Sequence, residues 1–230
     1  MISGVAIVVP ARDEEQRMAA CLDGIRRAVA RLPAGIGASV CVVADRCTDR
    51  TVDVVRQHGV TCLVNEEELS LGAVRDRGLR HAWARLGTAA GRTWLLSTDA
   101  DSVVPEEWIT HHLNWAGLGA QGVAGLISLG DSAELDEPTL RRYAELVSPR
   151  IRDHGHDHVY GANLGIRADA YLDVGGFPPI STGEDRALWA RLRESGCLLF
   201  TPCSAAVRTS ARTRGRAVGG VADLLAGLMQ

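Results

Sequence analysis

Short apolar runs that alternate with segments of helical spacing constrain the fold of this 230-residue chain more than any other feature. The first run, residues 5–9, is continuous, rich in valine and ended by Pro10, which is typical of a strand buried on both faces of a parallel sheet. Residues 14–32 then place their apolar side chains on one stripe, as an amphipathic helix does. Such strands and helices in alternation predict a mainly parallel sheet with helices on both faces. The further elements expected in this half are strands at 40–44, 60–64 and 93–98, and helices at 49–58 and 71–86.

After Asp101 the alternation becomes irregular. The chain nevertheless shows no low-complexity linker and no internal repeat, which favours one α/β domain over residues 1–230. We divide this domain into a first half of nucleotide-binding type at 1–101, an irregular second half at 102–215 and a C-terminal helix at 216–230. The elements expected after Asp101 are helices at 105–115, 138–147, 184–195 and 218–229, and strands or extended pairs at 121–129, 159–166, 198–201 and 205–207.

Composition excludes several kinds of chemistry and partner. The formal net charge is −3, so the whole chain has no field that would attract nucleic acid, and we expect no nucleic-acid partner. All 25 basic residues are arginine, which excludes a lysine Schiff base, a Walker-type lysine and a lysine general base. With 46% hydrophobic and 23% charged residues, the chain has the balance of an ordinary soluble globular domain.

The cysteines and the first residues indicate a cytoplasmic protein. Residues 1–10 lack a basic start ahead of an apolar core, so they do not have the pattern of a secretory signal. The longest uncharged stretch, 113–130, contains five glycines and is a poor membrane span. No cysteine lies in a C-x-x-C pair or at zinc-site spacing. We expect all six to be reduced and mostly buried, namely Cys21, Cys41, Cys47, Cys62, Cys197 and Cys203.

Polar residues at the carboxyl ends of the predicted strands are the first candidates for a site, because ligands of open α/β sheets bind there. This edge is acidic, which suits a divalent cation or the hydroxyl groups of a sugar better than a bare anion. The residues concerned are Arg12, Asp13 and Glu14 after the first strand, Asp45 and Arg46 after the second, residues 65–68 after the third, and Asp99 and Asp101 after the fourth.

Asp99 and Asp101 form the sharpest of these patterns. Two carboxylates one residue apart, just beyond a buried strand, can point the same way once the chain turns. One can then ligate a hard cation such as Mg²⁺ or Mn²⁺ while the other accepts from a hydroxyl. The alternative is that one of them only caps the helix expected near Pro105.

Glu184 and Asp185 open another predicted helix. Carboxylates in a first turn are favoured by the helix dipole, so capping explains at least one of them. The functional interpretation is that one reaches the site as a general base and accepts a proton from an acceptor hydroxyl. Residues 181–183 before them favour a flexible loop.

Three further patterns of residues have a structural as well as a functional explanation. Residues 117–122 match G-x-G-x-x-G but follow a helix and precede a strand, so they predict a turn and not a dinucleotide site. The histidines of 154–158 form an H-x-H-x-H run, which is either an exposed loop or a metal-binding strand face. Four arginines at Arg208, Arg212, Arg214 and Arg216 form either a solvated basic segment or a clamp on a diphosphate.

Several of these segments together resemble family two glycosyltransferases of the GT-A fold, over roughly residues 5–216. The resemblance implies a single GT-A-like domain whose first half binds a nucleotide sugar and whose second half binds the acceptor. It implies an inverting, hexosyltransferase-like enzyme that moves a sugar from a nucleoside-diphosphate donor to a hydroxyl acceptor. The segments are VVPARDEE (8–15), ADRCTDRT (44–51), LGAVRDRG (71–78), TDADS (98–102), VGGF (174–177) and EDRAL (184–188).

The resemblance also implies roles for single residues. Asp185, with Glu184 beside it, would be the general base, and Asp99 and Asp101 would hold Mg²⁺ or Mn²⁺ on the diphosphate. The residues implied to bind the donor are Pro10, Arg12, Asp13, Glu14, Asp45, Arg75 and Asp99, with Arg75 near the phosphates.

Two departures from the family pattern leave alternatives open. The usual D-D-G-S is Ala44-Asp45-Arg46-Cys47 here, and no histidine follows His158 to serve as an extra metal ligand. The metal would then rest on Asp101, the diphosphate and water, unless the arginine cluster or the histidine run supplies the missing charge. The rival functions are a nucleotidyltransferase and a catalytically silent sugar-nucleotide binder. The basic segment and the apolar tail would in addition allow peripheral contact with the inner face of a membrane or with a lipid acceptor.

Overall fold

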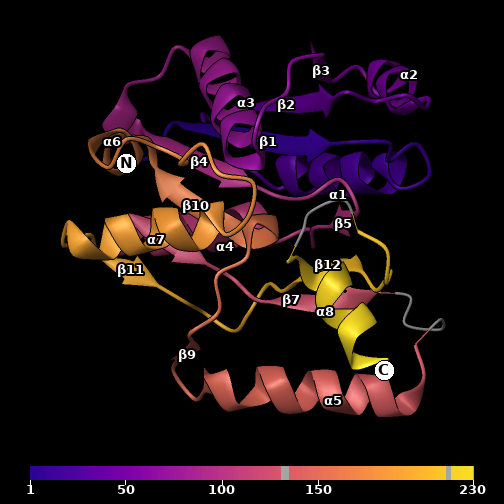
Figure 1. Cartoon of the computed structure of the whole chain (residues 1–230). Coiled ribbons are helices and arrows are strands. Elements are labelled where there is room, and N and C mark those ends of the chain that lie inside the picture. Colours follow the sequence, from indigo (N-terminus) through magenta and orange to yellow (C-terminus); the bar gives the residue numbers. More distant parts are fainter. Residues whose placement is uncertain (131–134, 216–218, 230) are drawn as a thin grey trace.

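The computed structural model describes residues 1–130, 135–215 and 219–229 (Figure 1). The elements of its first half are β1 (Gly4–Ala11), α1 (Met18–Ala30), β2 (Gly37–Asp45), α2 (Thr51–Gln57), β3 (Thr61–Asn65), α3 (Leu71–Leu86), η1 (Ala90–Arg92), β4 (Thr93–Ser97), β5 (Ser102–Val103) and α4 (Trp108–Gly117). Those of its second half are β6 (Gly122–Ala124), β7 (Ile127–Gly130), α5 (Glu137–Val147), η3 (Ser148–Arg150), β8 (Ile151–Arg152), β9 (Gly155–His156), η4 (Gly161–Asn163), β10 (Leu164–Arg167), α6 (Ala168–Asp173), α7 (Glu184–Glu194), β11 (Leu199–Phe200), β12 (Val207–Ser210) and α8 (Val221–Leu228).

A seven-stranded sheet forms the centre of the molecule, in the order β11-β6-β10-β4-β1-β2-β3. Neighbouring strands are parallel except for β10, which runs antiparallel to both β4 and β6. Helices lie on both faces of this sheet (Figure 1). The predicted α/β class with a mainly parallel sheet is therefore confirmed. The functional division at residues 101 and 215 stays a prediction.

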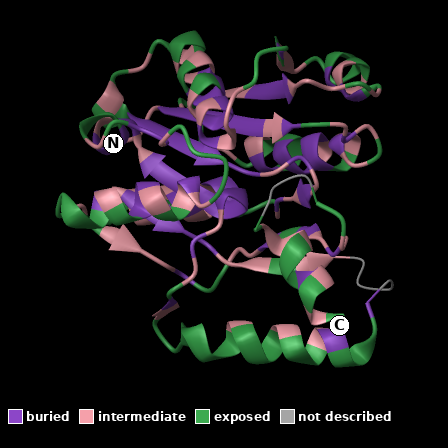
Figure 2. Cartoon of the chain, in the orientation of Figure 1, coloured by how far each residue is buried: buried purple, intermediate pink, exposed green. Residues whose placement is uncertain are grey.

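Alternate residues of β1 face two different core layers, as the pleat of a strand requires. Val5, Ile7 and Val9 belong to one buried cluster, which α1 and α4 cover. Ala6 and Val8 belong to the other, which α3 and α7 cover. Each of the larger apolar side chains contributes roughly 1.5–3 kcal/mol on burial, so the two layers hold the sheet in place. Figure 2 shows the central strands buried and α5 largely exposed.

Helix α3 packs closely on the sheet because of a single glycine. A Cβ at Gly78 would lie 2.3 Å from Val8 Cγ2 and 2.7 Å from Val43 Cγ2, so any side chain would push the helix away. The helix begins with a cap in which Ser70 Oγ accepts from the Ala73 amide at 3.3 Å. It ends at Gly87, whose φ of 62° suits glycine.

Helices predicted to begin at residues 14, 49 and 105 begin later, at Met18, Thr51 and Trp108. The Glu14 amide donates to Thr51 Oγ1 at 2.7 Å, at the start of α2, so Glu14 belongs to a loop. Its carbonyl accepts from Met18 at 2.9 Å and starts the helical hydrogen bonding there. The helix prediction was therefore wrong at its first turn, and the loop keeps the Glu14 side chain at the strand edge.

The single strand expected at 121–129 is in fact two strands in two sheets. β6 belongs to the central sheet, whereas β7 joins β5 and β12 in a three-stranded sheet in the order β5-β12-β7. The break falls at Gly125, where a Cβ would lie 2.2 Å from Asn163 Nδ2. Periodicity alone cannot reveal this break, because both pieces are apolar.

Asn163 explains both this break and the irregular structure at 159–166. Its Oδ1 accepts from Trp108 Nε1 at 2.9 Å and lies 3.1 Å from His112 Nε2. Its Nδ2 donates to the carbonyl oxygens of Leu126 at 2.9 Å and Ala205 at 3.2 Å. The residue is 1% exposed, and η4 turns the chain to aim its side chain inward. A continuous strand could not make these four contacts, so the expected strand is replaced by η4 followed by β10.

The second half ends beside α5. Leu225 of α8 is buried in a small cluster with Leu135 and Ala211, so the C-terminal helix packs where α5 begins (Figure 1). Part of the predicted helix at 218–229 and Arg216 lie outside the described residues. Within the described ranges, no helix combines the length and the apolarity needed to cross a membrane. All six cysteines are free thiols; two are buried, three are partly buried and Cys203 is exposed.

Candidate functional site

A cavity of about 630 Å³ lies at the carboxyl ends of β1, β2 and β4, where the strand-end rule places a ligand. The start of η4, the end of α5 and the starts of α7 and α8 complete its wall. Of the ten residues predicted for the site, all but Asp13 border this one cavity: Pro10, Arg12, Glu14, Asp45, Arg75, Asp99, Asp101, Glu184 and Asp185. Residues far apart in sequence thus meet in one place, although this placement does not by itself test their roles.

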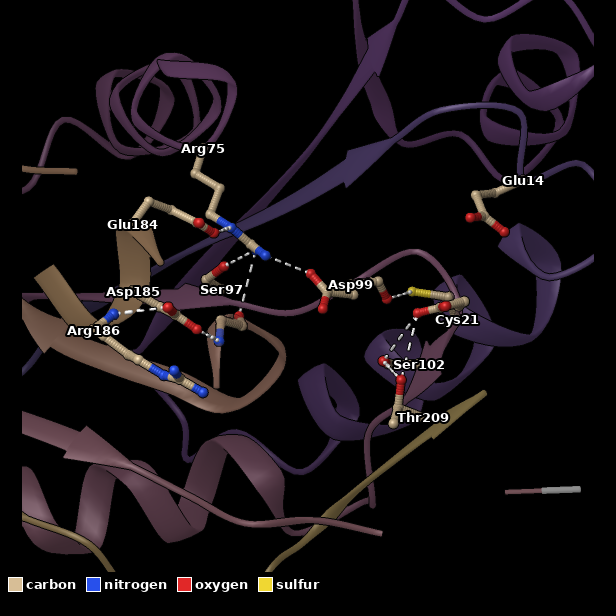
Figure 3. Close-up of polar contacts among 12 residues, drawn as sticks. Glu14, Cys21, Arg75, Ser97, Asp99, Ser102, Glu184, Asp185, Arg186 and Thr209 are labelled. Atoms are coloured by element: carbon tan, nitrogen blue, oxygen red, sulfur yellow. Dashed lines mark hydrogen bonds and ion pairs between the residues drawn. The ribbon is translucent and has the colours of Figure 1, made fainter. Parts of the chain in front are cut away.

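Arg75, on α3, connects the carboxylate of Asp99, after β4, with that of Glu184, at the start of α7. Its Nε donates to Glu184 Oε1 at 3.0 Å and its Nη2 to Asp99 Oδ1 at 2.6 Å. Its Nη1 donates to Ser97 Oγ at 2.6 Å and to the Gly161 carbonyl at 3.4 Å. Figure 3 shows the guanidinium between Glu184 and Asp99. These partners use four of the five guanidinium N–H groups, so a contact between Arg75 and a donor phosphate, as the family resemblance implies, has one N–H left to use.

The carboxylates around Arg75 keep its guanidinium charged despite its burial. Burial disfavours the charged form of Arg75, but the carboxylates of Asp99 and Glu184 outweigh it and raise the pKa of Arg75 above its usual value. Burial also raises the pKa of Glu184, against the lowering effect of Arg75. With side chains 3% and 5% exposed, Arg75 and Glu184 form a buried ion pair. We therefore expect Glu184 to position Arg75 and not to exchange protons with a substrate.

Asp185 directly follows Glu184 in the chain but has a different environment. Its Oδ2 accepts from the Gly161 amide at 2.8 Å and its Oδ1 from the Arg186 amide at 2.7 Å. The side chain is partly exposed, borders the cavity and lies on the same side of Arg75 as Glu184 (Figure 3). Gly183, with φ of 73°, provides the left-handed turn that starts α7 at this point. An anchored but accessible carboxylate can accept a proton from a bound hydroxyl.

Gly72 sets the position of the loop before α7. The Gly72 amide donates to the Ile180 carbonyl at 3.1 Å. A Cβ on this residue would lie 1.8 Å from the Pro178 carbonyl oxygen and 3.2 Å from Glu184 Cβ. Only glycine lets α3 and the loop approach this closely, so the backbone of α3 helps to place the first turn of α7.

Asp99 and Asp101 both border the cavity but have different partners. Asp99 pairs with Arg75, whereas Asp101 Oδ2 lies 2.9 Å from Arg212 Nη2. The Ser102 hydroxyl, which donates to Thr209 Oγ1 at 2.9 Å, fixes the backbone next to Asp101 (Figure 3). Burial raises the pKa of Asp101 to about 6, the nearby Asp99 charge adds to this, and Arg212 opposes it.

The loop after β1 is held by its own hydrogen bonds. Asp13, with φ of 53°, accepts at Oδ1 from the Thr48 amide and hydroxyl at 2.7 and 3.2 Å. The Thr48 amide lowers the pKa of Asp13, although burial opposes this. Asp13 does not border the cavity, so the structure does not bring it to the donor site with Glu14. Asp45 does border it and accepts from Asn65 Nδ2 at 2.7 Å.

Two sets of residues could hold a cation. Asp13, Cys47 and Asp49 are the group of three or more His, Cys, Asp or Glu side chains within the described ranges whose ligand atoms all lie within 4.8 Å. Their oxygens accept from the Thr48, Asp49, Glu15 and Thr51 amides, which accounts for the group as loop structure. The other set is Asp99 and Asp101, whose carboxylates border the cavity and offer the oxygen ligands that Mg²⁺ and Mn²⁺ prefer. A divalent cation therefore fits the second set better.

The histidine run does not form a metal site in the described part of the chain. His156 is buried in β9, while His158 stacks on Tyr160 with 5.5 Å between ring centroids. His158 Nε2 lies 3.0 Å from the Val147 carbonyl oxygen. Tyr160 borders the cavity beside Asp185, a position that sequence reasoning missed because η4 brings it there.

Comparisons with known proteins agree with this geometry. The sequence model described as glycosyl transferase family 2 matches residues 6–175. No curated protein matches the chain. Among solved structures, the mannosyltransferase PcManGT from Pyrobaculum calidifontis, in complex with GDP-Man and Mn²⁺, is similar with a TM-score of 0.71 at 20% identity, over 92% of this chain and 58% of that one.

Two other solved structures extend the comparison. S. aureus TarS 1–349 in complex with UDP-GlcNAc has a TM-score of 0.69 at 14% identity, over 98% of this chain and 66% of that one. Glucosyl-3-phosphoglycerate synthase from Mycobacterium tuberculosis has a TM-score of 0.60 at 14% identity, over 98% and 78% of the two chains. This chain thus spans less than two thirds of the first two. At these identities the similarity shows the fold, which is that of GT-A glycosyltransferases.

Proposed function

The chain belongs to glycosyltransferase family 2, and from this premise we propose that it transfers a hexose-type sugar from a nucleoside-diphosphate donor to a hydroxyl acceptor, with inversion. The observation that carries the proposal is the single cavity in which both acidic pairs meet, Asp99 with Asp101 and Glu184 with Asp185. Nucleotide sugars bound to PcManGT and TarS support the class of donor.

The donor would lie along the carboxyl edge of the sheet. Pro10, Arg12 and Glu14 after β1, and Asp45 after β2, offer carbonyl, guanidinium and carboxylate groups to a base and a ribose. Asp99, whose side chain is 35% exposed, keeps Oδ2 available for a hydroxyl or a cation while Oδ1 pairs with Arg75. The diphosphate would then lie between this edge and the start of α7.

Mg²⁺ or Mn²⁺ is the cofactor that the proposal includes. Asp99 and Asp101 would hold it, and the bound cation would neutralise charge that develops on the leaving diphosphate. Mn²⁺ in the PcManGT complex supports this choice. Arg75 keeps Asp99 in place on the protein side, through the 2.6 Å contact described above.

Asp185 is the proposed general base. In the transfer, its carboxylate takes the proton of the acceptor hydroxyl while that oxygen bonds to the anomeric carbon of the sugar. The bond from that carbon to the diphosphate oxygen breaks, and the diphosphate leaves with the electron pair. Attack from the face opposite the leaving group inverts the centre. The Gly161 and Arg186 amides orient the carboxylate for this role.

The acceptor would enter from the side formed by the second half of the chain. Leu146, Tyr160 and Leu224 border the cavity there, together with Arg150 and Arg186. Contact with a membrane surface and the cytoplasmic location stay predictions. Flotation of the full chain on vesicles with and without anionic lipid tests the first, and absence of flotation on both would reject it.

The rival functions make different demands on the same cavity. A nucleotidyltransferase usually needs a glycine-rich nucleotide loop with a nearby basic residue, and residues 10–14 contain no glycine. A silent binder would keep donor affinity without turnover. Release of a nucleoside diphosphate from the sugar nucleotide, instead of pyrophosphate, separates transfer from nucleotidyl chemistry.

The first test is thermal unfolding of the full chain with UDP, GDP and their sugar conjugates, each with Mn²⁺, Mg²⁺ or EDTA. A ligand at 100 times its Kd adds about 2.7 kcal/mol to the free energy of unfolding, which raises Tm by roughly 5–10 °C in a chain of this size. Asp101→Ala should lose the metal-dependent part of this shift. Asp153→Ala is the matched control, because Asp153 is exposed and does not border the cavity.

Asp185→Asn separates binding from transfer. It should keep the donor-induced shift in Tm and lower the transfer rate by about 10²–10⁴-fold, the usual contribution of a positioned base. Asp173→Asn, at the exposed end of α6, controls for the loss of one charge. Transfer at the wild-type rate by Asp185→Asn would move the base to another residue.

A further inference from the structure

Arg212 lies against the carboxylates that the proposed metal needs. Its Nη2 is 2.7 Å from Glu14 Oε1 and 2.9 Å from Asp101 Oδ2, so one nitrogen contacts both side chains. The three side chains are only 18%, 5% and 14% exposed. This is the bridging position of a small cation between two carboxylates, occupied by a side chain of the protein itself.

Arg212 lies beyond the part of the chain that the family model matches. It follows β12, two residues beyond Ser210, in a segment with no helix or strand. The family match ends at residue 175, and no histidine follows His158. The sequence groups Arg212 with three other arginines as either a solvated basic segment or a clamp on a diphosphate, and the structure turns its side chain to the carboxylates. The described neighbours Arg208 and Arg214 are exposed.

The carboxylates that contact Arg75 and Arg212 outnumber these two guanidinium groups. Arg75 and Arg212 together contact four carboxylates, which carry four negative charges when ionised against two positive charges. A guanidinium and a divalent ion cannot share the same oxygen of Asp101 without strong repulsion, because like charges at such distances repel even at high effective dielectric. Metal binding at Asp101 Oδ2 therefore requires Arg212 to move.

Arg212 has a second partner within reach when a donor is bound. It borders the same cavity as Asp99 and Asp101, and guanidinium groups suit phosphate oxygens geometrically. We propose that Arg212 is the resident cation of the metal site: it holds Glu14 and Asp101 until a divalent ion binds, and then contacts the donor diphosphate. This inference rests on the proposed function, and it predicts that metal and nucleotide strengthen each other's binding partly through Arg212.

The test is the affinity for Mn²⁺, measured by calorimetry and by the EPR signal of free Mn²⁺ at pH 8. In wild type, Mn²⁺ alone should bind weakly, and UDP or GDP should raise its affinity. In Arg212→Met no guanidinium competes, so Mn²⁺ alone should bind about tenfold more tightly, the equivalent of one charge-assisted hydrogen bond. The enhancement by nucleotide should shrink by a similar factor. Arg214→Met, which removes an exposed charge from the same segment, should behave as wild type.

A second measurement covers the case in which Arg212→Met does not fold. In the wild-type chain, the ¹⁵N–¹H resonance of the Arg212 side chain, identified with Arg212→Lys, should shift on addition of Mg²⁺ with UDP or GDP. Equal Mn²⁺ affinity in wild type and Arg212→Met, or an Arg212 resonance that does not move, overturns the inference and leaves the proposed function intact. Donor binding and transfer that are unchanged in EDTA would overturn the metal role and this inference, but not glycosyl transfer.

Discussion

The buried pair of Arg75 and Glu184 allows a stability prediction that does not depend on any substrate. Arg75→Met keeps most of the side-chain volume but removes all four hydrogen bonds of the guanidinium. Asp99 is 35% exposed and can be rehydrated, whereas Glu184 is 5% exposed and cannot. The variant therefore leaves one buried carboxylate without its partner.

The expected loss follows from that orphaned carboxylate. Breaking a buried ion pair by removing one partner costs about 3–5 kcal/mol. For a chain of this length each kcal/mol lowers Tm by about 2–4 °C, so we expect Tm to fall by roughly 6–20 °C. Urea and thermal denaturation followed by circular dichroism at pH 7 measure both quantities.

A double-mutant cycle shows whether the mechanism is the right one. Glu184→Gln in the Arg75→Met background removes the buried charge, so the double variant should be more stable than the sum of the single losses predicts. Arg85→Met, on the exposed side of the same helix α3, should change stability by no more than about 0.5 kcal/mol. If Arg75→Met costs no more than Arg85→Met, or the double variant recovers nothing, the argument from the orphaned carboxylate is refuted.

Two further predictions concern pH and backbone packing. Burial lowers the pKa of His112 from 6.5 to about 4, so the unfolded chain takes up the proton at a higher pH than the folded chain does. About 3 kcal/mol of the free energy of unfolding, present above pH 6.5, should therefore be lost as the pH falls to 4. A urea midpoint that stays constant over that pH range would contradict this. Gly72→Ala should force the loop before α7 away from α3, which lowers the free energy of unfolding by about 1–3 kcal/mol and reduces transfer more than donor binding. Gly227→Ala is the control and should not destabilise the chain, because a Cβ at Gly227 meets nothing within 4 Å. Transfer at the wild-type rate by Gly72→Ala would show that α7 does not depend on this contact.

The first half of the fold could be predicted because its signals are local. The continuous apolar run of β1 and the helical stripe of α1 each satisfy a period within a few residues, and the structure differs from them mainly at their ends. The second half follows long-range contacts instead. Asn163 bonds to groups 37 to 55 positions away, and no periodic pattern encodes such partners. The break between β6 and β7 was missed for this reason.

The candidate site shows the same division. The rule that ligands bind at strand ends predicts that Asp45, Asp99 and Asp101 lie at one edge of the sheet. They do border one cavity there, because the carboxyl ends of parallel strands share an edge. The rule could not show that Arg75 is occupied by protein partners. Nor could it separate Arg212 from the exposed arginines beside it, since the four look alike in sequence. Those differences depend on burial and on which carboxylate each guanidinium meets.

The distance along the chain between Glu14 and Arg212 has a consequence for biosynthesis. Chains emerge from the ribosome N-terminus first, so β1 and the loop that carries Glu14 are available long before β12 has been made. Arg75 likewise waits for Glu184, 109 positions later. A nascent chain in which β1 to β4 have already paired therefore still lacks Arg212, the second arginine that contacts the acidic edge of the sheet. The charges at the rim of the cavity are therefore balanced late in synthesis, after β12 and Arg212 have been made.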